Sequence, residues 1–129
     1  MQTSFTEQQL ENKDNKSSES ILRKCVHCGM CNATCPTFAI NGDELEGPRG
    51  RIYLIKDMLE NNKPANKKIV KHIDSCLSCY GCMSTCPSGV NYMHLIDHGR
   101  NHVEETYKRP ILDRLFRNIL SYTLPKPNV

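Results

Sequence analysis

Tryptophan is absent from this 129-residue chain, and aromatic residues make up only 6% of it. Apolar residues reach 38%, which is low for a domain that folds on an apolar core alone, so we expect another element to help hold the fold together. No apolar run approaches the roughly 18 residues that a membrane-spanning helix needs. The formal net charge of +3 is too small to predict binding to nucleic acid or to an anionic membrane surface.

The N-terminal segment MQTSFTEQQLENKDNKSSES also lacks the basic stretch and apolar run of a secretory signal. We therefore expect a cytoplasmic chain. In a reducing cytosol thiols stay free, so clustered cysteines there are metal ligands or redox groups rather than disulfides.

All eight cysteines lie in two copies of one motif. The first motif, residues 25–37, reads CVHCGMCNATCPT, and the second motif, residues 76–88, reads CLSCYGCMSTCPS. Each has the spacing C-x2-C-x2-C-x3-C-P, which is typical of bacterial [4Fe–4S] sites. Two-residue spacers let a tight loop place three thiolates around one face of a cubane cluster, while the proline after the fourth cysteine redirects the chain.

In two-cluster proteins the fourth cysteine of each motif ligates the other cluster. The sequence therefore predicts two [4Fe–4S] clusters, with ligands shared crosswise between the motifs. The first cysteine set is Cys25, Cys28, Cys31 and Cys86, and the second cysteine set is Cys76, Cys79, Cys82 and Cys35.

The alternative is a zinc-bound interaction module with two structural zinc ions. Such sites usually pair one C-x2-C with another roughly 15–20 residues away and lack the closely spaced third and fourth cysteines. The complete quartet, present twice, favours iron–sulfur chemistry. Since no substrate site is evident in the sequence, two clusters in one small domain indicate one-electron relay.

The remaining sequence predicts an all-α fold, with helices strung between two cysteine loops and no alternating strand pattern of useful length. Apolar residues recur at helical spacing in four segments, namely 51–62, 65–75, 91–107 and 110–120. Asn91 is a plausible N-cap, Gly99 would permit close helix approach, and Pro110 stands where a helix would start. Residues 39–50 are expected to form a loop, because they contain three glycines and a proline.

Several polar residues have two interpretations. His94, His98 and His102 recur every four residues and could suggest haem or metal ligation, but their flank borders an apolar stripe, where polar residues are expected. His27 could donate a hydrogen bond to a cluster sulfur or simply be solvated. Arg49 and Arg51 could fold over a cluster, contact a partner or balance charge.

Together the motifs resemble a known family. The stretches CVHCGMCNATCPTF, GDELEGPRGRIYLIKDMLE, HIDSCLSCYGCMSTCPSGVNY and LIDHGR closely resemble the N-terminal part of the iron–sulfur subunits of bacterial glycolate oxidases. The resemblance runs from about Ile21 to Pro110, and the wider family includes the iron–sulfur subunits of anaerobic glycerol-3-phosphate dehydrogenase and of lactate utilisation.

The resemblance implies an α-helical ferredoxin domain over residues 21–109, preceded by a flexible lead-in over residues 1–20. Members of the family continue into a longer region with two further cysteine-rich segments. Residues 110–129 would then be an amphipathic helix and tail at the start of such a region. The apolar stripe of the 111–120 helix would pack either on that region or back on the helices of this chain.

The resemblance also implies a function as an electron-transfer subunit of a glycolate oxidase (glycolate dehydrogenase) complex, without substrate catalysis by this chain alone. A flavin-containing partner subunit would oxidise glycolate to glyoxylate, and the clusters would pass the electrons to a membrane quinone or another acceptor. We expect a cytoplasmic location, peripheral at the inner membrane through the complex. The alternative is a ferredoxin-like carrier for another 2-hydroxy-acid or glycerol-3-phosphate dehydrogenase complex.

Overall fold

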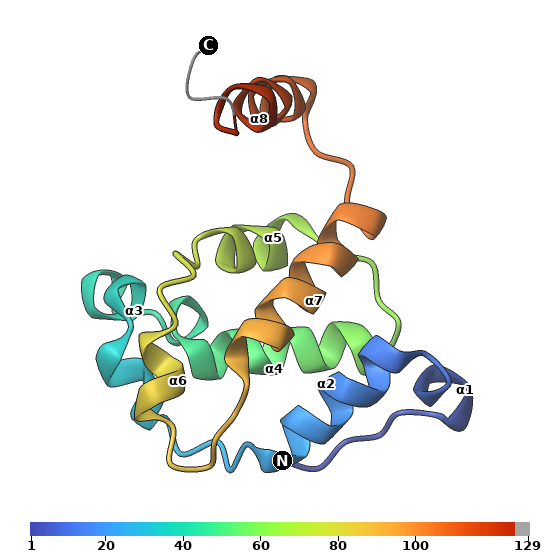
Figure 1. Cartoon of the computed structure of the whole chain (residues 1–129), viewed down its shortest axis with the longest axis vertical. Helices are drawn as coiled ribbons and strands as arrows, with labels where there is room; N and C mark the ends of the chain where they lie inside the picture. Colours follow the sequence, from blue (N-terminus) through green and yellow to red (C-terminus); the bar gives the residue numbers. More distant parts are fainter. Residues whose placement is uncertain (126–129) are drawn as a thin grey trace.

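The computed structural model describes residues 1–125, which contain helices and no strand. The predicted all-α class is therefore confirmed for this part of the chain (Figure 1). In chain order the elements are α1 (Glu7–Leu10), α2 (Lys13–Lys24), η1 (Met30–Thr34), α3 (Pro36–Asn41), η2 (Glu44–Glu46), α4 (Pro48–Glu60), α5 (Lys67–Asp74), α6 (Gly81–Thr85), α7 (Tyr92–Thr106) and α8 (Ile111–Thr123), where η marks a short 3₁₀ helix.

Helix α4 is the centre of the fold, because it contacts α2, α5 and α7 as well as the short helices η1 and η2. The predicted apolar stripes meet here. Ile55 of α4, Ile73 of α5 and Leu95 of α7 are fully buried, and Leu22 of α2 joins them. The short elements η1, α3, η2 and α6 gather with the cysteine motifs at one end of this core (Figure 1).

Polar caps fix where the long helices begin. Asn66 accepts a hydrogen bond from the backbone N–H of Ile69 at 3.0 Å, and the predicted N-cap Asn91 accepts one from His94 at 3.2 Å. Such caps satisfy N–H groups that have no partner within the helix. Because Asn91 follows the second motif closely, its cap fixes the direction in which α7 leaves the cysteine loop.

The expected loop over residues 39–50 is largely helical, and this prediction was wrong. Pro36 provides a favourable first residue for α3, which Gly42 ends in the left-handed region with φ of 65°. Residues Glu44–Glu46 then form η2, and α4 begins at Pro48, three residues before the apolar periodicity starts. Glycine and proline mark helix ends here rather than a continuous loop.

The N-terminal segment is more ordered than a flexible lead-in. Asn12 caps α2, whose Ser18 and Leu22 are both fully buried. The hydroxyl of Ser18 lies 2.7 Å from Nδ1 of His98 on α7. Residues 13–24 therefore pack on the same core as the helices after them, and a domain boundary at residue 21 would divide α2.

Helix α8 stands apart from the other helices (Figure 1). Its apolar side chains, Ile111, Leu112, Leu115, Phe116 and Ile119, are each more than half exposed. Polar contacts hold the helix instead. Arg109 binds Asp74 at 2.6 Å and 3.1 Å and Glu104 at 2.6 Å, while Arg117 reaches Asp74 at 3.0 Å.

The apolar side chains of α8 therefore do not pack on the other helices within residues 1–125. None of the helices in the same range combines the length and the apolar character needed to cross a membrane.

Candidate metal centres

The two cysteine motifs share an unusual backbone conformation. In the first motif His27 and Gly29 adopt positive φ values of 60° and 82°, and in the second motif Ser78 and Tyr80 adopt 54° and 55°. These pairs occupy equivalent positions, 51 residues apart. A left-handed residue other than glycine costs of order 1 kcal/mol or more, so the matching pattern indicates that both loops are folded around the same kind of group.

The motifs also pack against each other. Each left-handed stretch leads into a short helix at an equivalent position, η1 in the first motif and α6 in the second, and these helices are in contact. The equivalent residues Thr34 and Thr85 lie 3.4 Å apart through their hydroxyl oxygens. Contact between equivalent residues is expected when two copies are related by an approximate twofold rotation, and this arrangement brings the fourth cysteine of each motif toward the other motif.

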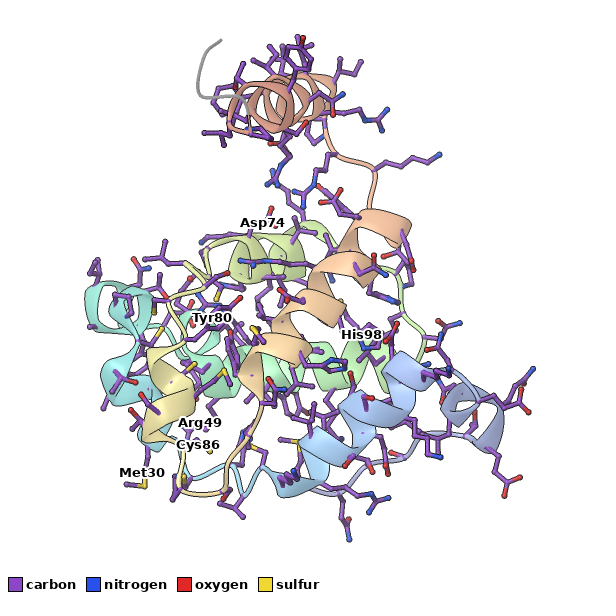
Figure 2. The ribbon with its side chains drawn as sticks, in the orientation of Figure 1. Met30, Arg49, Asp74, Tyr80, Cys86 and His98 are labelled. Carbon is purple, nitrogen blue, oxygen red and sulfur yellow. The ribbon has the colours of Figure 1, made fainter. Side chains whose placement is uncertain are left out.

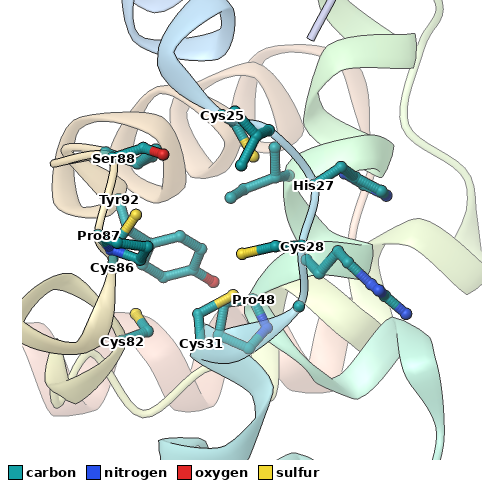
Figure 3. Close-up of a pocket in the computed structure, with 15 residues that line it drawn as sticks. Cys25, His27, Cys28, Cys31, Pro48, Cys82, Cys86, Pro87, Ser88 and Tyr92 are labelled. Carbon is teal, nitrogen blue, oxygen red and sulfur yellow. The ribbon is translucent and has the colours of Figure 1, made fainter.

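A first cavity lies between the two motifs (Figure 3). It encloses about 440 Å³, part of it open to solvent, and the whole first cysteine set lines it. Cys82 also reaches this cavity, as do Pro48 and Tyr92. Figure 3 shows the sulfurs of Cys25, Cys28, Cys31 and Cys86 directed toward a common space.

A second cavity, of about 310 Å³ including space open to solvent, is lined by the whole second cysteine set, together with Arg51 and Tyr92. Cys35 lines only this second cavity, whereas Cys86 lines only the first. Each cavity is therefore bordered by three cysteines of one motif and by the fourth cysteine of the other.

The cysteines fit clusters better than single ions. All eight are free, and among residues 1–125 no three histidine, cysteine or carboxylate side chains gather closely enough to hold one metal ion. Thiols spaced around a cavity match a cubane, whose iron corners each take a separate thiolate. Cys25, Cys35 and Cys82 are buried, while Cys28 and Cys79 are exposed, so each cavity has one edge near the surface.

A buried polar network surrounds Cys35. Arg51, only 1% exposed, directs Nη1 to the Cys35 sulfur at 3.8 Å and Nη2 to a Glu46 carboxylate oxygen at 3.0 Å. Its Nη2 also contacts the Ser75 hydroxyl at 3.0 Å, and its Nε donates to the His72 carbonyl at 2.6 Å. Nδ1 of His72 lies 2.7 Å from the second Glu46 oxygen. The network ties α4 and α5 to the second cavity.

Because of these surroundings, the thiols of Cys35 and Cys82 differ in pKa. Burial raises the pKa of the Cys82 thiol to about 12. Burial also acts to raise the pKa of Cys35, but hydrogen bonds with the Thr37 hydroxyl and the Phe38 backbone oppose it. The Arg51 guanidinium adds to this opposition and leaves the pKa of Cys35 below its ordinary value. Since a metal takes the thiolate, Cys35 is prepared for binding by the protein, whereas Cys82 depends on the metal to release its proton.

The other residues singled out in the sequence have mixed outcomes. Of the two arginines, Arg51 touches a cysteine sulfur, whereas Arg49 is partly exposed and pairs with Glu44. Within residues 1–125 no hydrogen bond joins His27 to a sulfur, and its ring lies against Tyr53 with centroids 6.3 Å apart. Figure 2 places Arg49 at the same end of the molecule as α6, far from Asp74 and α8.

Sequence reasoning missed Tyr92 as a site residue. Its hydroxyl donates to the Cys76 sulfur at 3.6 Å, and its ring lines both cavities. The sequence signals only the apolar face of the helix that Tyr92 begins.

The histidine flank of α7 does not form a metal site in the described part of the chain. His94 and His98 stack edge to face with ring centroids 6.1 Å apart, His98 binds Ser18, and His102 contacts the Lys63 carbonyl at 2.7 Å. These contacts join α7 to α2 and to the loop after α4, so the flank has a structural role.

Comparisons with known proteins agree with this geometry. Residues 21–90 match the family model of the 4Fe-4S dicluster domain. The chain is 52% identical to the glycolate oxidase iron-sulfur subunit of Escherichia coli (strain K12), over all of this chain and 31% of the relative. It is 30% identical to the probable glycolate oxidase iron-sulfur subunit of Bacillus subtilis (strain 168), over 96% of this chain and 28% of the relative.

A weaker similarity, 26% identity over 76 residues, links the chain to the succinate dehydrogenase iron-sulfur subunit of Paracoccus denitrificans, over 54% of this chain and 29% of the relative. No solved structure matches. The chain spans less than a third of the length of these curated relatives.

The zinc alternative is therefore set aside, because the family model describes iron–sulfur chemistry and the two cavities hold all eight free cysteines. The match covers more than half of the chain. The chain belongs to the 4Fe-4S dicluster domain family, and its cofactors are two [4Fe–4S] clusters.

Proposed function

We propose that this chain is the electron-transfer part of a glycolate oxidase-type complex. The first cysteine set holds one cluster and the second cysteine set holds the other. A flavin-containing partner subunit oxidises glycolate, and the electrons leave this chain toward a membrane quinone or another acceptor. The chain acts in the cytoplasm, and its complex brings it to the inner membrane.

One observation carries this proposal: three cysteines of one motif and the fourth of the other line each cavity, and Cys82 of the second set also reaches the first cavity. The bound clusters supply reversible one-electron chemistry. The buried Cys25, Cys35 and Cys82 fix the inner corners of the two sites, while Cys28 and Cys79 keep one edge of each site near the surface. Electrons can therefore pass at these edges without a substrate entering the fold.

The printed names of the two glycolate oxidase relatives support the choice of complex. Those relatives are more than three times as long as the segment they share with this chain. Together with the exposed apolar side chains of α8, this supports a ferredoxin domain that ends at residue 109 and the start of a further region over residues 110–129.

Cysteine variants test the ligand assignment. Anaerobically purified protein is expected to contain about eight iron and eight sulfide per chain. In electron paramagnetic resonance spectra of the reduced protein, Cys35→Ser should alter the same signal as Cys79→Ser. Cys86→Ser should instead alter the signal that Cys28→Ser alters. If Cys35→Ser changes the signal of Cys28→Ser, the crosswise assignment is wrong.

The complex tests the proposed reaction. The chain, co-purified with its flavin-containing partner, should show bleaching of the cluster absorption on anaerobic addition of glycolate. Lactate and glycerol 3-phosphate serve as competing substrates. Faster bleaching with either of these would replace glycolate oxidase with the corresponding dehydrogenase complex.

A further inference from the structure

The two cysteine sets have different polar surroundings. In the second set the Cys35 sulfur faces the Arg51 guanidinium at 3.8 Å and the Thr37 hydroxyl at 3.2 Å. The Cys76 sulfur accepts a hydrogen bond from the Tyr92 hydroxyl at 3.6 Å. Two of the four sulfurs in this set therefore have a polar side-chain hydrogen directed at them from the core.

The first set has no such donor among residues 1–125. Its one side-chain contact joins the Cys31 sulfur to Oδ1 of Asn32, at 4.0 Å. That oxygen is an acceptor, and it already receives the backbone N–H of Arg49. The amide nitrogen of Asn32 points away to both carboxylate oxygens of Glu44.

Fixed charge is also placed unequally. Arg51 is buried, and its ion pair with Glu46 forms through Nη2 while Nη1 faces the sulfur, so the positive end of the pair touches the second set. Arg100 binds the Cys76 carbonyl at 2.7 Å and the Ser78 hydroxyl at 2.6 Å, but the Met1 ammonium binds the equivalent Cys25 carbonyl in the first set. These two contacts do not distinguish the sets, so the inequality rests on Arg51.

Arg49 lies near the first set, but its positive charge acts on that set more weakly than the charge of Arg51 acts on the second set. The side chain of Arg49 is 32% exposed and is paired with Glu44, so water and the carboxylate screen its charge.

Reduction adds a negative charge to a cluster. Hydrogen bonds to its sulfurs and nearby positive charge stabilise that state and raise the reduction potential. We propose that the polypeptide gives its two clusters unequal potentials, that the cluster in the second cysteine set is the more easily reduced, and that Arg51 and Tyr92 set this difference. The inference rests on the ligand assignment proposed above.

This order gives the relay a direction. One electron leaves the reduced cluster of the first set, which is thereby oxidised, and enters the oxidised cluster of the second set, which is thereby reduced, without bond cleavage or proton transfer. The flavin-containing partner of the proposed complex supplies the electron. The exposed edge at Cys28 is then the entry, and the exposed edge at Cys79 is the exit.

A redox titration of the anaerobic two-cluster protein, followed by electron paramagnetic resonance, tests the order. Two reduction steps are expected, and the step at higher potential should be the one that Cys79→Ser alters. If Cys28→Ser alters the higher step instead, the proposed order is overturned. A wrong ligand assignment would be seen separately. Either the iron content would be too low, or Cys35→Ser would alter the same signal as Cys28→Ser.

Tyr92→Phe tests the cause, because it removes the hydroxyl donor and keeps the buried ring. It should lower the potential of the higher step only, by up to about a tenfold change in the equilibrium constant, which is about 59 mV for one electron. Tyr53→Phe is the matched control, since Tyr53 is 57% exposed, and it should move neither step. An unchanged higher step in Tyr92→Phe would overturn the role given to Tyr92.

Arg51 is tested in the paired variant R51Q/E46Q, which removes both buried charges together and avoids leaving one unpaired. The higher step should again fall while the lower step keeps its position. If this variant takes up no cluster, Arg51→Lys provides the second measurement, because it keeps the charge and loses the planar contact with the sulfur. An unmoved higher step in whichever variant is loaded would overturn the role given to Arg51.

Discussion

His98 is a half-buried titratable residue that lies outside both cysteine sets. Its Nδ1 lies 2.7 Å from the Ser18 hydroxyl, and this contact joins α7 to α2. Burial lowers the pKa of His98 below its ordinary value, Asp14 opposes this effect, and His94 adds to it. The neutral ring is therefore the form that the folded state prefers.

The lowered pKa of His98 predicts a loss of stability in mild acid. As the pH falls through the ordinary histidine value of about 6.5, the unfolded chain binds a proton that folded His98 resists, so the free energy of unfolding decreases until the folded pKa is reached. His98→Gln should weaken this decrease, measured as the thermal unfolding midpoint of the anaerobic two-cluster protein at about pH 8 and about pH 6.

His102→Gln is the control for this measurement, because the hydrogen bond of His102 to the Lys63 carbonyl is exposed. Its pH dependence should follow that of the unmodified chain. Equal pH dependence in His98→Gln and the unmodified chain would contradict the role given to His98.

The cysteines that line the two cavities could be singled out from sequence, because the three spacings within each motif are short and local. Their neighbours could not, since Arg51 lies 16 residues from Cys35 and Tyr92 lies 16 residues from Cys76. The spacing of the motif carries no information on which side chain from another helix will reach a sulfur. Arg51 was considered from sequence, but its burial and its link to Glu46 and His72 depend on how α4 packs against α5.

At the scale of helices, α4 and α7 pack closely because Gly99 has no side chain. A Cβ atom added at Gly99 would lie 2.8 Å from Cγ1 and 3.1 Å from Cδ1 of Ile55, which is fully buried. Since both helices carry the polypeptide to or from the cysteine motifs, their separation influences the shape of both cavities.

Gly99→Ala is predicted to destabilise the protein by about 1 kcal/mol. Overpacking in a core costs about 1–3 kcal/mol, and the higher helix propensity of alanine returns about 1 kcal/mol. In an Ile55→Ala background the clash is absent, so the same change should stabilise by up to about 1 kcal/mol. The measurement is a double-mutant cycle in urea unfolding. If Gly99→Ala has the same sign in both backgrounds, the close approach of the helices does not explain this glycine.

Helices α4, α5 and α7 were predictable because each has an apolar stripe at helical spacing, although the start of α4 was not. Helix α3 was missed, since its six residues are too few to show a period and its start coincides with the proline that ends the first motif. The packing of α2 was missed for a related reason, because its buried residues include Ser18, whose partner His98 is 80 residues away.

For the whole molecule, the two clusters take the place of a larger apolar core. The cavities lie between the motifs and directly beside the buried residues of α4 and α7. Without metal, the eight thiols of these cavities lose the bonds that hold the two motifs together. Binding energy at such sites contributes to folding, because the unfolded chain has no preformed site.

Removal of iron is therefore predicted to unfold most of the chain. Anaerobic treatment with a chelator should abolish cooperative thermal unfolding and most of the helical circular dichroism signal. Protein taken through the same steps without chelator should retain both. A metal-free protein that melts at the same temperature as the loaded protein would show that the apolar core alone is sufficient.

The contact between Thr34 and Thr85 joins equivalent residues of the two motifs, so each motif lies against its own counterpart. One polypeptide carries both copies, with α3, α4 and α5 between them. The symmetry therefore stops at the motifs, because the residues between them occur once. A guanidinium such as Arg51 accordingly lies beside one group of thiols and has no counterpart imposed on the other.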